Sequence, residues 1–183
     1  MIQKPLAGVC IPEVLSRAEC EHIKRESLKR MTRATTLVQG SAKVTRDRTC
    51  DYGWLDEPDG TWQWLKDRLI STMAKANVHT QCKIGGMQTL QVLRYKPLQK
   101  FAEHFDTYSG SNRKATMVVQ LSSPREYWGG GLWLDGRDHV DMDKMHEQGS
   151  AVFFPSYLKH KANAPFFGHR WSLVCWFTGE PWQ

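Results

Sequence analysis

From residue 87 onward the chain is a series of short apolar runs separated by turn residues, and this pattern constrains the fold more than any other feature. The runs are rich in β-branched and aromatic side chains, which favour strands. They cover residues 87–95, 116–121, 132–134, 151–154 and 171–178. Because no helical pattern lies between them, the sequence predicts an antiparallel sandwich such as a jelly roll.

The first third of the chain predicts helices instead. Ser16 and Glu19 have the spacing of a capping box, which predicts a helix that ends near residue 31. Residues 32–60 are polar and end in a turn sequence, as expected of a loop or a short edge strand. Apolar residues at helical spacing predict a second helix over residues 62–77. We expect a mainly β, α+β chain in which both N-terminal helices pack on one sheet.

Length and composition fit one folded domain over residues 1–183, with residues 1–86 as helical support and residues 87–183 as the jelly-roll core. Hydrophobic residues make up 40% of the chain, yet no stretch is apolar for long enough to span a bilayer. The first ten residues lack the apolar run of a signal peptide. We therefore expect a soluble cytoplasmic protein that does not bind membranes.

Cysteine content and charge exclude little. The five cysteines are widely spaced, without a Cys-x-x-Cys pair, which favours reduced structural thiols over a zinc site or a redox dithiol. A net charge of +6 would allow an acidic partner or nucleic acid. The basic residues of the first predicted helix could equally form one solvated face.

A candidate metal site lies in the strand-rich part. His104 and Asp106 project to the same side of an extended segment, so they could bind one metal together. His160 follows a buried-strand pattern over residues 149–155 and could return to the same end of the sandwich. Two imidazoles and one carboxylate can occupy one face of Fe(II) and leave the opposite face open for a chelating cosubstrate and oxygen.

Arg170 lies ten residues after His160, at the start of the last predicted strand. If its side chain points into the sandwich, its guanidinium is buried and needs an anionic partner. The distal carboxylate of 2-oxoglutarate would suit a rigid, permanently charged, bidentate donor better than it would suit an ammonium.

An isolated His-x-Asp pattern is more often a surface pair than a metal site. The chain contains a second copy, His139 and Asp141, with His146 close behind, in a charged stretch that resembles a solvated loop. The first copy follows a clear strand pattern and is framed by aromatic residues, so we rank it above the second.

Several segments between residues 88 and 178 carry a family resemblance. In order, they are residues 90–95 (LQVLRY), 104–106 (HFD), 113–122 (RKATMVVQLS), 127–132 (YWGGGL), 149–156 (GSAVFFPS), His160 and 168–177 (GHRWSLVCWF). This set resembles the prolyl 4-hydroxylase-like branch of the 2-oxoglutarate- and Fe(II)-dependent dioxygenases. Within that branch it is most similar to the microbial and phage proteins with a proline/lysine hydroxylase (PKHD) domain.

The resemblance implies a double-stranded β-helix with iron on His104, Asp106 and His160, and with 2-oxoglutarate on Arg170. It also implies that Tyr95 contacts the cosubstrate, although a core aromatic would occupy the same position. Thr116 and Gln120 are further candidates on a strand that should line the pocket, and Trp176 matches an aromatic wall position. The cofactors implied are Fe(II), 2-oxoglutarate and O2, with ascorbate as a reductant.

The implied reaction is hydroxylation of a C–H bond with release of succinate and CO2. Asp106 favours hydroxylation, because halogenating relatives lack this carboxylate. A peptidyl proline is the leading substrate. Collagen-hydroxylating relatives often carry Tyr and Lys where this chain has Gln120 and Arg170, which weakens the transfer of a collagen substrate.

Other functions stay open at this point. A free amino acid or another small molecule is the main alternative substrate. Nucleic-acid oxidation and a noncatalytic binding module are less favoured, because the arginine pattern of the nucleic-acid branch is absent and the ligand set is whole. Substrate recognition is expected from exposed basic and aromatic residues before the second predicted helix: Arg46, Arg48, Tyr52 and Trp54.

Overall fold

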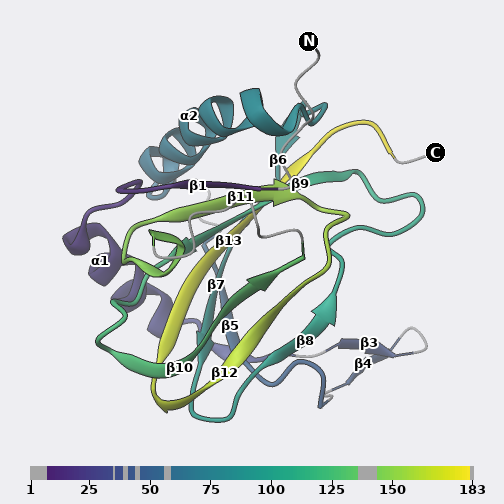
Figure 1. The fold of residues 1–183 in the computed structure, drawn as a ribbon. Helices are drawn as coiled ribbons and strands as arrows, with labels where there is room; N and C mark the ends of the chain where they lie inside the picture. The colour runs from purple at the N-terminus through teal and green to yellow at the C-terminus, as the bar shows by residue number, and fades with distance from the viewer. Residues whose placement is uncertain are drawn as a thin grey trace.

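The computed structural model describes residues 8–34, 36–38, 41–43, 46–55, 59–135 and 144–181. Within this part of the chain, a large and a small antiparallel sheet face each other (Figure 1). The large sheet has the order β1 (Val9–Ile11), β11 (Ala151–Pro155), β9 (Arg113–Gln120), β13 (Arg170–Thr178), β7 (Leu90–Tyr95), β5 (Asp51–Leu55) and β2 (Thr32–Arg33), and β6 (Gly86–Met87) also pairs with β13. This architecture is the predicted jelly roll.

The small sheet has the order β10 (Tyr127–Leu134), β12 (His160–Gly168) and β8 (Phe101–His104). A separate hairpin consists of β3 (Thr36–Val38) and β4 (Ser41–Lys43). A short 3-10 helix, η2 (Lys144–His146), precedes β11. The second His-x-Asp pattern, His139 and Asp141, lies outside the described residues.

Alternation along the strands separates two hydrophobic cores. On β9, Met117 and Val119 face the helices, whereas Val118 faces the small sheet together with Leu93 and Val174 of neighbouring strands. Successive side chains of a strand point to opposite faces, so one strand can serve both cores. The inner core is completed by the small sheet through Leu132, Leu134 and Ala162.

Both helices cover the outer face of the large sheet, as predicted (Figure 1). Helix α1 (Arg17–Leu28) begins with the predicted capping box, in which the Glu19 amide donates to Ser16 Oγ at 3.3 Å and the Ser16 amide donates to Glu19 Oε2 at 2.7 Å. Helix α2 (Gln63–Thr80) is buried on the side of Leu65, Leu69 and Ala76. No helix among the described residues is long and apolar enough to cross a bilayer.

The region over residues 32–60 differs from the prediction of a loop or an edge strand. Strand β5 lies inside the large sheet, paired with β7 from Asp51 to Leu55, and β2 takes the edge position. Tyr52 of β5 packs against the inner core and Leu55 of β5 is buried in the outer core, so this strand contributes to both. Strand β5 was not predicted, because its five residues lie within a largely polar stretch of sequence.

Candidate active site

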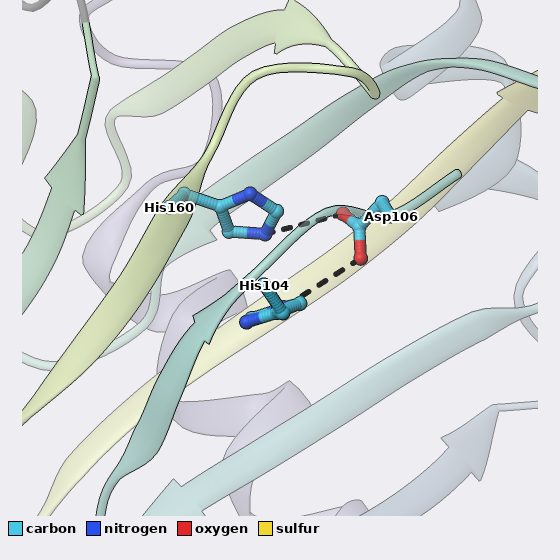
Figure 2. Close-up of side chains that lie close together, drawn as sticks. All are labelled: His104, Asp106 and His160. Atoms are coloured by element: carbon cyan, nitrogen blue, oxygen red, sulfur yellow. Dashed lines mark ion pairs between the residues drawn. The ribbon is translucent and has the colours of Figure 1, made fainter. Parts of the chain in front are cut away.

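His104, Asp106 and His160 come together at one end of the sandwich (Figure 2). His104 ends β8 and His160 begins β12, and the two residues lie directly opposite each other in the sheet. His160 Nε2 lies 3.3 Å from Asp106 Oδ2, and His104 Nε2 lies 3.7 Å from Asp106 Oδ1. One potential ligand atom from each residue lies within 4.8 Å of the other two. The structure therefore brings the predicted triad together.

Hydrogen bonds to the backbone orient both imidazoles. His104 Nδ1 lies 2.7 Å from the Ala102 carbonyl oxygen, and His160 Nδ1 lies 2.9 Å from the Leu158 carbonyl oxygen. A carbonyl only accepts, so each Nδ1 carries the proton and each Nε2 keeps its lone pair. Both lone pairs are available to a metal beside Asp106, and this pattern is typical of ligating histidines.

Asp106 is buried and held as a carboxylate. Thr116 Oγ1 donates to Asp106 Oδ2 at 2.7 Å and lies 3.1 Å from Ser156 Oγ, while the Asp106 amide donates to the Ser156 carbonyl at 3.0 Å. Burial raises the pKa of Asp106, but the contact with the His160 imidazole and the hydrogen bond from Thr116 outweigh burial and hold that pKa well below its ordinary range. A permanent anion at this position suits a divalent cation.

His104 is neutral near pH 7. Burial lowers the pKa of its imidazole to about 4, with a further contribution from His160. The ring stacks on Phe101 at a centroid distance of 3.6 Å. Two imidazoles with exposed lone pairs and one carboxylate match the donor set of an Fe(II) oxygenase, so the residues present fit the metal that the resemblance implies.

Arg170 is 1% exposed, and its Nε and Nη2 atoms have no hydrogen-bond partner among the described residues. Its guanidinium carbon lies 5.5 Å from the centre of the Tyr95 ring. A buried guanidinium without a counterion is costly, because the protein interior solvates charge poorly. Arg170 lines the same cavity as the triad, so a dicarboxylate could be held at its far end here.

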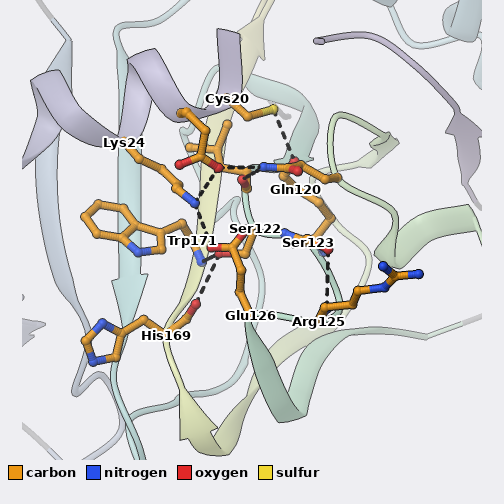
Figure 3. Close-up of polar contacts among 12 residues, drawn as sticks. Cys20, Lys24, Gln120, Ser122, Ser123, Arg125, Glu126, His169 and Trp171 are labelled. Carbon is orange, nitrogen blue, oxygen red and sulfur yellow. Dashed lines mark hydrogen bonds and ion pairs between the residues drawn. The ribbon is translucent and has the colours of Figure 1, made fainter. Parts of the chain in front are cut away.

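Hydrogen bonds on both sides of Arg170 fix its backbone. Ser122 Oγ donates to the His169 carbonyl at 3.1 Å, and the Trp171 amide donates to Ser122 Oγ at 3.0 Å (Figure 3). Nearby, Lys24 of α1 bridges Glu21 and Glu126 at 2.8 and 2.7 Å. The helix layer thus supports the strand end from which Arg170 points inward.

The cavity has a volume of about 370 Å³. Tyr95 and Thr116, two of the residues predicted to contact the cosubstrate, line this cavity. Gln120 is fully buried on β9 opposite Ser172, but it is not among the residues that line the cavity. Its side-chain nitrogen and oxygen have no hydrogen-bond partner among the described residues.

Of the four residues expected to recognise substrate, Arg48 and Trp54 line the cavity, whereas the exposed Arg46 does not. Tyr52 lies beside Arg48, with 5.7 Å between the guanidinium carbon and the ring centre. The sequence prediction missed Arg113, which also lines the cavity. The pairing of β9 with β13 shifts register beside Arg113, so simple strand alternation does not give the direction of its side chain.

Comparisons with known proteins find similar sequences and folds among oxygenases. The family model of the 2OG-Fe(II) oxygenase superfamily matches residues 90–178. A PKHD-type hydroxylase of Picosynechococcus sp. is 27% identical over 63% of this chain and 54% of its own length. The Arabidopsis thaliana protein named probable prolyl 4-hydroxylase 3 is 30% identical over 61% of this chain and 40% of its own length. The chain thus spans about half the length, or less, of these curated relatives.

The fold also matches solved structures. A prolyl hydroxylase from Trichoplax adhaerens, in complex with a peptide fragment of the hypoxia inducible factor oxygen degradation domain, superposes with a TM-score of 0.73 and 17% identity. The superposition covers 94% of this chain and 83% of that chain. The chain is thus similar in sequence to the 2OG-Fe(II) oxygenase superfamily over residues 90–178, and to its prolyl 4-hydroxylase-like members, and it shares the fold of a solved prolyl hydroxylase.

Proposed function

We propose that this chain is a 2-oxoglutarate- and Fe(II)-dependent dioxygenase that hydroxylates a C–H bond and releases succinate and CO2. One observation carries the proposal: an oriented His-Asp-His triad and a buried, unneutralised Arg170 line one cavity. A metal and a dicarboxylate would satisfy both features at once. When bound, iron and 2-oxoglutarate supply the oxidising chemistry, and the protein supplies orientation and a protected pocket.

Each residue of the site then has a defined task. His104, Asp106 and His160 would hold Fe(II) through their Nε2 and carboxylate oxygen atoms, and Thr116 would keep the Asp106 carboxylate in position. Arg170 would hold the distal carboxylate of 2-oxoglutarate beside Tyr95. Gln120 does not line the cavity, so its contact with the cosubstrate stays a prediction.

For the substrate, we propose a C–H bond of a proline residue in a peptide or protein. The support is the similarity to prolyl hydroxylases, one of which is named for its complex with a peptide. A free amino acid or other small molecule is the second candidate, favoured by the basic residues that line the cavity. A supporting role for residues 1–86, a cytoplasmic location and ascorbate as reductant stay predictions.

Incorporation of isotopic oxygen tests this proposal. The Fe(II)-loaded protein is incubated with 2-oxoglutarate, 18O2 and a pool of proline-containing peptides, and the products are analysed by mass spectrometry. The proposal predicts peptides that gain one 18O atom, and no gain with Asp106→Ala. If succinate forms but no peptide is labelled, the substrate assignment is wrong and the small-molecule candidate takes its place.

A further inference from the structure

The backbone of Arg170 is held differently on its two sides. Toward β7, Arg170 is paired with Tyr95 in the regular ladder of the large sheet. Toward β9, the last regular pair is Ser172 with Gln120, two residues short of Arg170. The same register would place Ser122 opposite Arg170, but β9 has already ended there. On this side, another contact must fix the first residues of β13.

The Ser122 hydroxyl supplies that contact. The Leu121 amide still donates to the Trp171 carbonyl at 3.0 Å. The Trp171 amide, however, donates to Ser122 Oγ at 3.0 Å, and Ser122 Oγ donates to the His169 carbonyl at 3.1 Å (Figure 3). These two bonds reach the residues directly before and after Arg170, and Ser122 is fully buried. One hydroxyl therefore fixes the backbone from which the Arg170 side chain enters the cavity.

A chain of hydrogen bonds connects the residue before Ser122 to helix α1. The Leu121 carbonyl accepts from Gln148 Nε2 at 2.9 Å, and the same nitrogen donates to Glu21 Oε1 at 2.9 Å. Glu21 Oε1 also accepts from Lys24 Nζ at 2.8 Å. The position of Leu121 thus depends on two charged residues of α1.

A second chain connects the residue after Ser122 to the same helix. The Ser123 amide donates to Glu126 Oε1 at 2.8 Å, and the Glu126 amide donates to the Ser123 carbonyl at 2.9 Å. Lys24 Nζ donates to Glu126 Oε2 at 2.7 Å, and only 11% of the Lys24 side chain is exposed. Because Lys24 belongs to both chains, one buried cation closes a ring of contacts around Ser122 (Figure 3).

We propose that Ser122 is a positioning residue for Arg170, and that the loop around it, held by α1, sets the affinity of the site for the distal carboxylate of 2-oxoglutarate. This inference rests on the proposed oxygenase function. A guanidinium binds a carboxylate best through two parallel hydrogen bonds, so its angle matters as well as its charge. Ser122 is not among the described residues that line the cavity, and it therefore acts through Arg170.

Two metal-chelating acids separate a positioning role from general damage. The protein is loaded with Mn(II), and isothermal titration calorimetry measures the binding of 2-oxoglutarate and of oxalate, which can chelate the metal but has no distal carboxylate. Ser122→Ala should raise the Kd of 2-oxoglutarate roughly 10- to 100-fold, the loss expected when one of two charge-assisted hydrogen bonds is broken. The Kd values of oxalate and Mn(II) should not change. Ser122→Thr, which keeps the hydroxyl, should restore most of the affinity for 2-oxoglutarate.

Two further variants show whether the effect passes through Arg170. Ser27→Ala is the matched control, because Ser27 is also fully buried but donates to the Ile23 carbonyl at 2.7 Å within α1. This control should leave the Kd values of both acids unchanged. In an Arg170→Leu background, Ser122→Ala should cause no further loss of 2-oxoglutarate binding, because residues that act as one unit are not additive.

Glu126→Ala covers the case in which Ser122→Ala does not fold. It removes the acceptor of the Ser123 amide and of Lys24, on a side chain that is 36% exposed. The Kd of 2-oxoglutarate should rise roughly 2- to 10-fold, which corresponds to one ordinary hydrogen bond, and the Kd of oxalate should not change.

The outcomes separate this inference from the proposed function. Native affinity for 2-oxoglutarate in Ser122→Ala, or in Glu126→Ala where Ser122→Ala does not fold, overturns the inference alone. An equal loss of oxalate binding, the same loss in Ser27→Ala, or a further loss in the Arg170→Leu background overturns the positioning role. A native Mn(II)-loaded protein that binds oxalate but not 2-oxoglutarate overturns the proposed function.

Discussion

Replacing Thr116 with Val should weaken metal binding without disturbing the fold. The Thr116 hydroxyl is buried and donates to Asp106 Oδ2 at 2.7 Å, so it orients one of the three metal ligands. Valine has nearly the same shape, and the change therefore removes the donor without creating a cavity. A hydrogen bond to a charged group is worth about 1.5–3 kcal/mol. Loss of a group that orients a metal ligand commonly costs about 10- to 100-fold in metal affinity, which corresponds to a similar energy.

The Kd of Mn(II), followed by electron paramagnetic resonance of the free ion, gives the measurement. Thr116→Val should raise this Kd on the order of 10- to 100-fold, and Thr116→Ser, which keeps the hydroxyl, should restore most of the affinity. Thr72→Val is the matched control, because Thr72 is also buried but donates to the Arg68 carbonyl at 2.8 Å within α2. If Thr116→Val binds Mn(II) as tightly as the native protein, the reasoning about Asp106 is wrong.

Three further predictions follow from buried charges and thiols. Arg170→Leu should raise the Kd of 2-oxoglutarate on the order of 100-fold, measured by calorimetry. The melting temperature of the metal-free protein should not fall, because the substitution removes a buried charge that has no partner. A lower melting temperature would contradict this reasoning. Burial raises the pKa of Asp51, but hydrogen bonds from Lys96 and Arg94 outweigh burial and hold that pKa below its ordinary value. Asp51→Asn should therefore lower the free energy of unfolding by about 1–3 kcal/mol at pH 7. In urea unfolding at several pH values, the difference between the variant and the native protein should disappear as the pH falls through the lowered pKa, since the native carboxylate then gains a proton. Burial raises the pKa of Cys20 to about 12, so iodoacetamide at pH 8 should label the partly exposed Cys10 and Cys82 of the native protein but leave the three buried cysteines unmodified; rapid labelling of Cys20 would show that the helix layer opens readily.

The part of the fold predicted best has a strong local signal. The Ser16–Glu19 capping box and the apolar spacing of the second helix place α1 and α2 within a few residues of their bounds. The strongly apolar runs became β7, β9, β11 and β13 of the large sheet. These patterns arise because a helix or strand that is buried on one or both faces needs apolar residues at fixed spacings, and such spacings are visible in the sequence.

Strands that depend on long-range pairing were harder to predict. Strand β8 has no fully buried residue, and β12 mixes buried and exposed residues around Pro165. Both are stabilised by neighbours far away in the sequence, as in the pairing of His160 with His104. The prediction of His104, Asp106 and His160 as one site rested on residue types and on family resemblance, whereas their hydrogen bonds to Ala102, Leu158 and Thr116 required the structure.

Release of labelled CO2 from 1-14C 2-oxoglutarate tests the central claim most directly. The Fe(II)-loaded protein should release CO2 even without substrate, slowly, because the triad and Arg170 line one cavity. Asp106→Ala should abolish release, whereas the Thr72→Val control in α2 should release CO2 at the native rate. Absence of release from a correctly folded, Fe(II)-loaded native protein, or equal release by Asp106→Ala, would contradict the assignment of this cavity as an oxygenase active site.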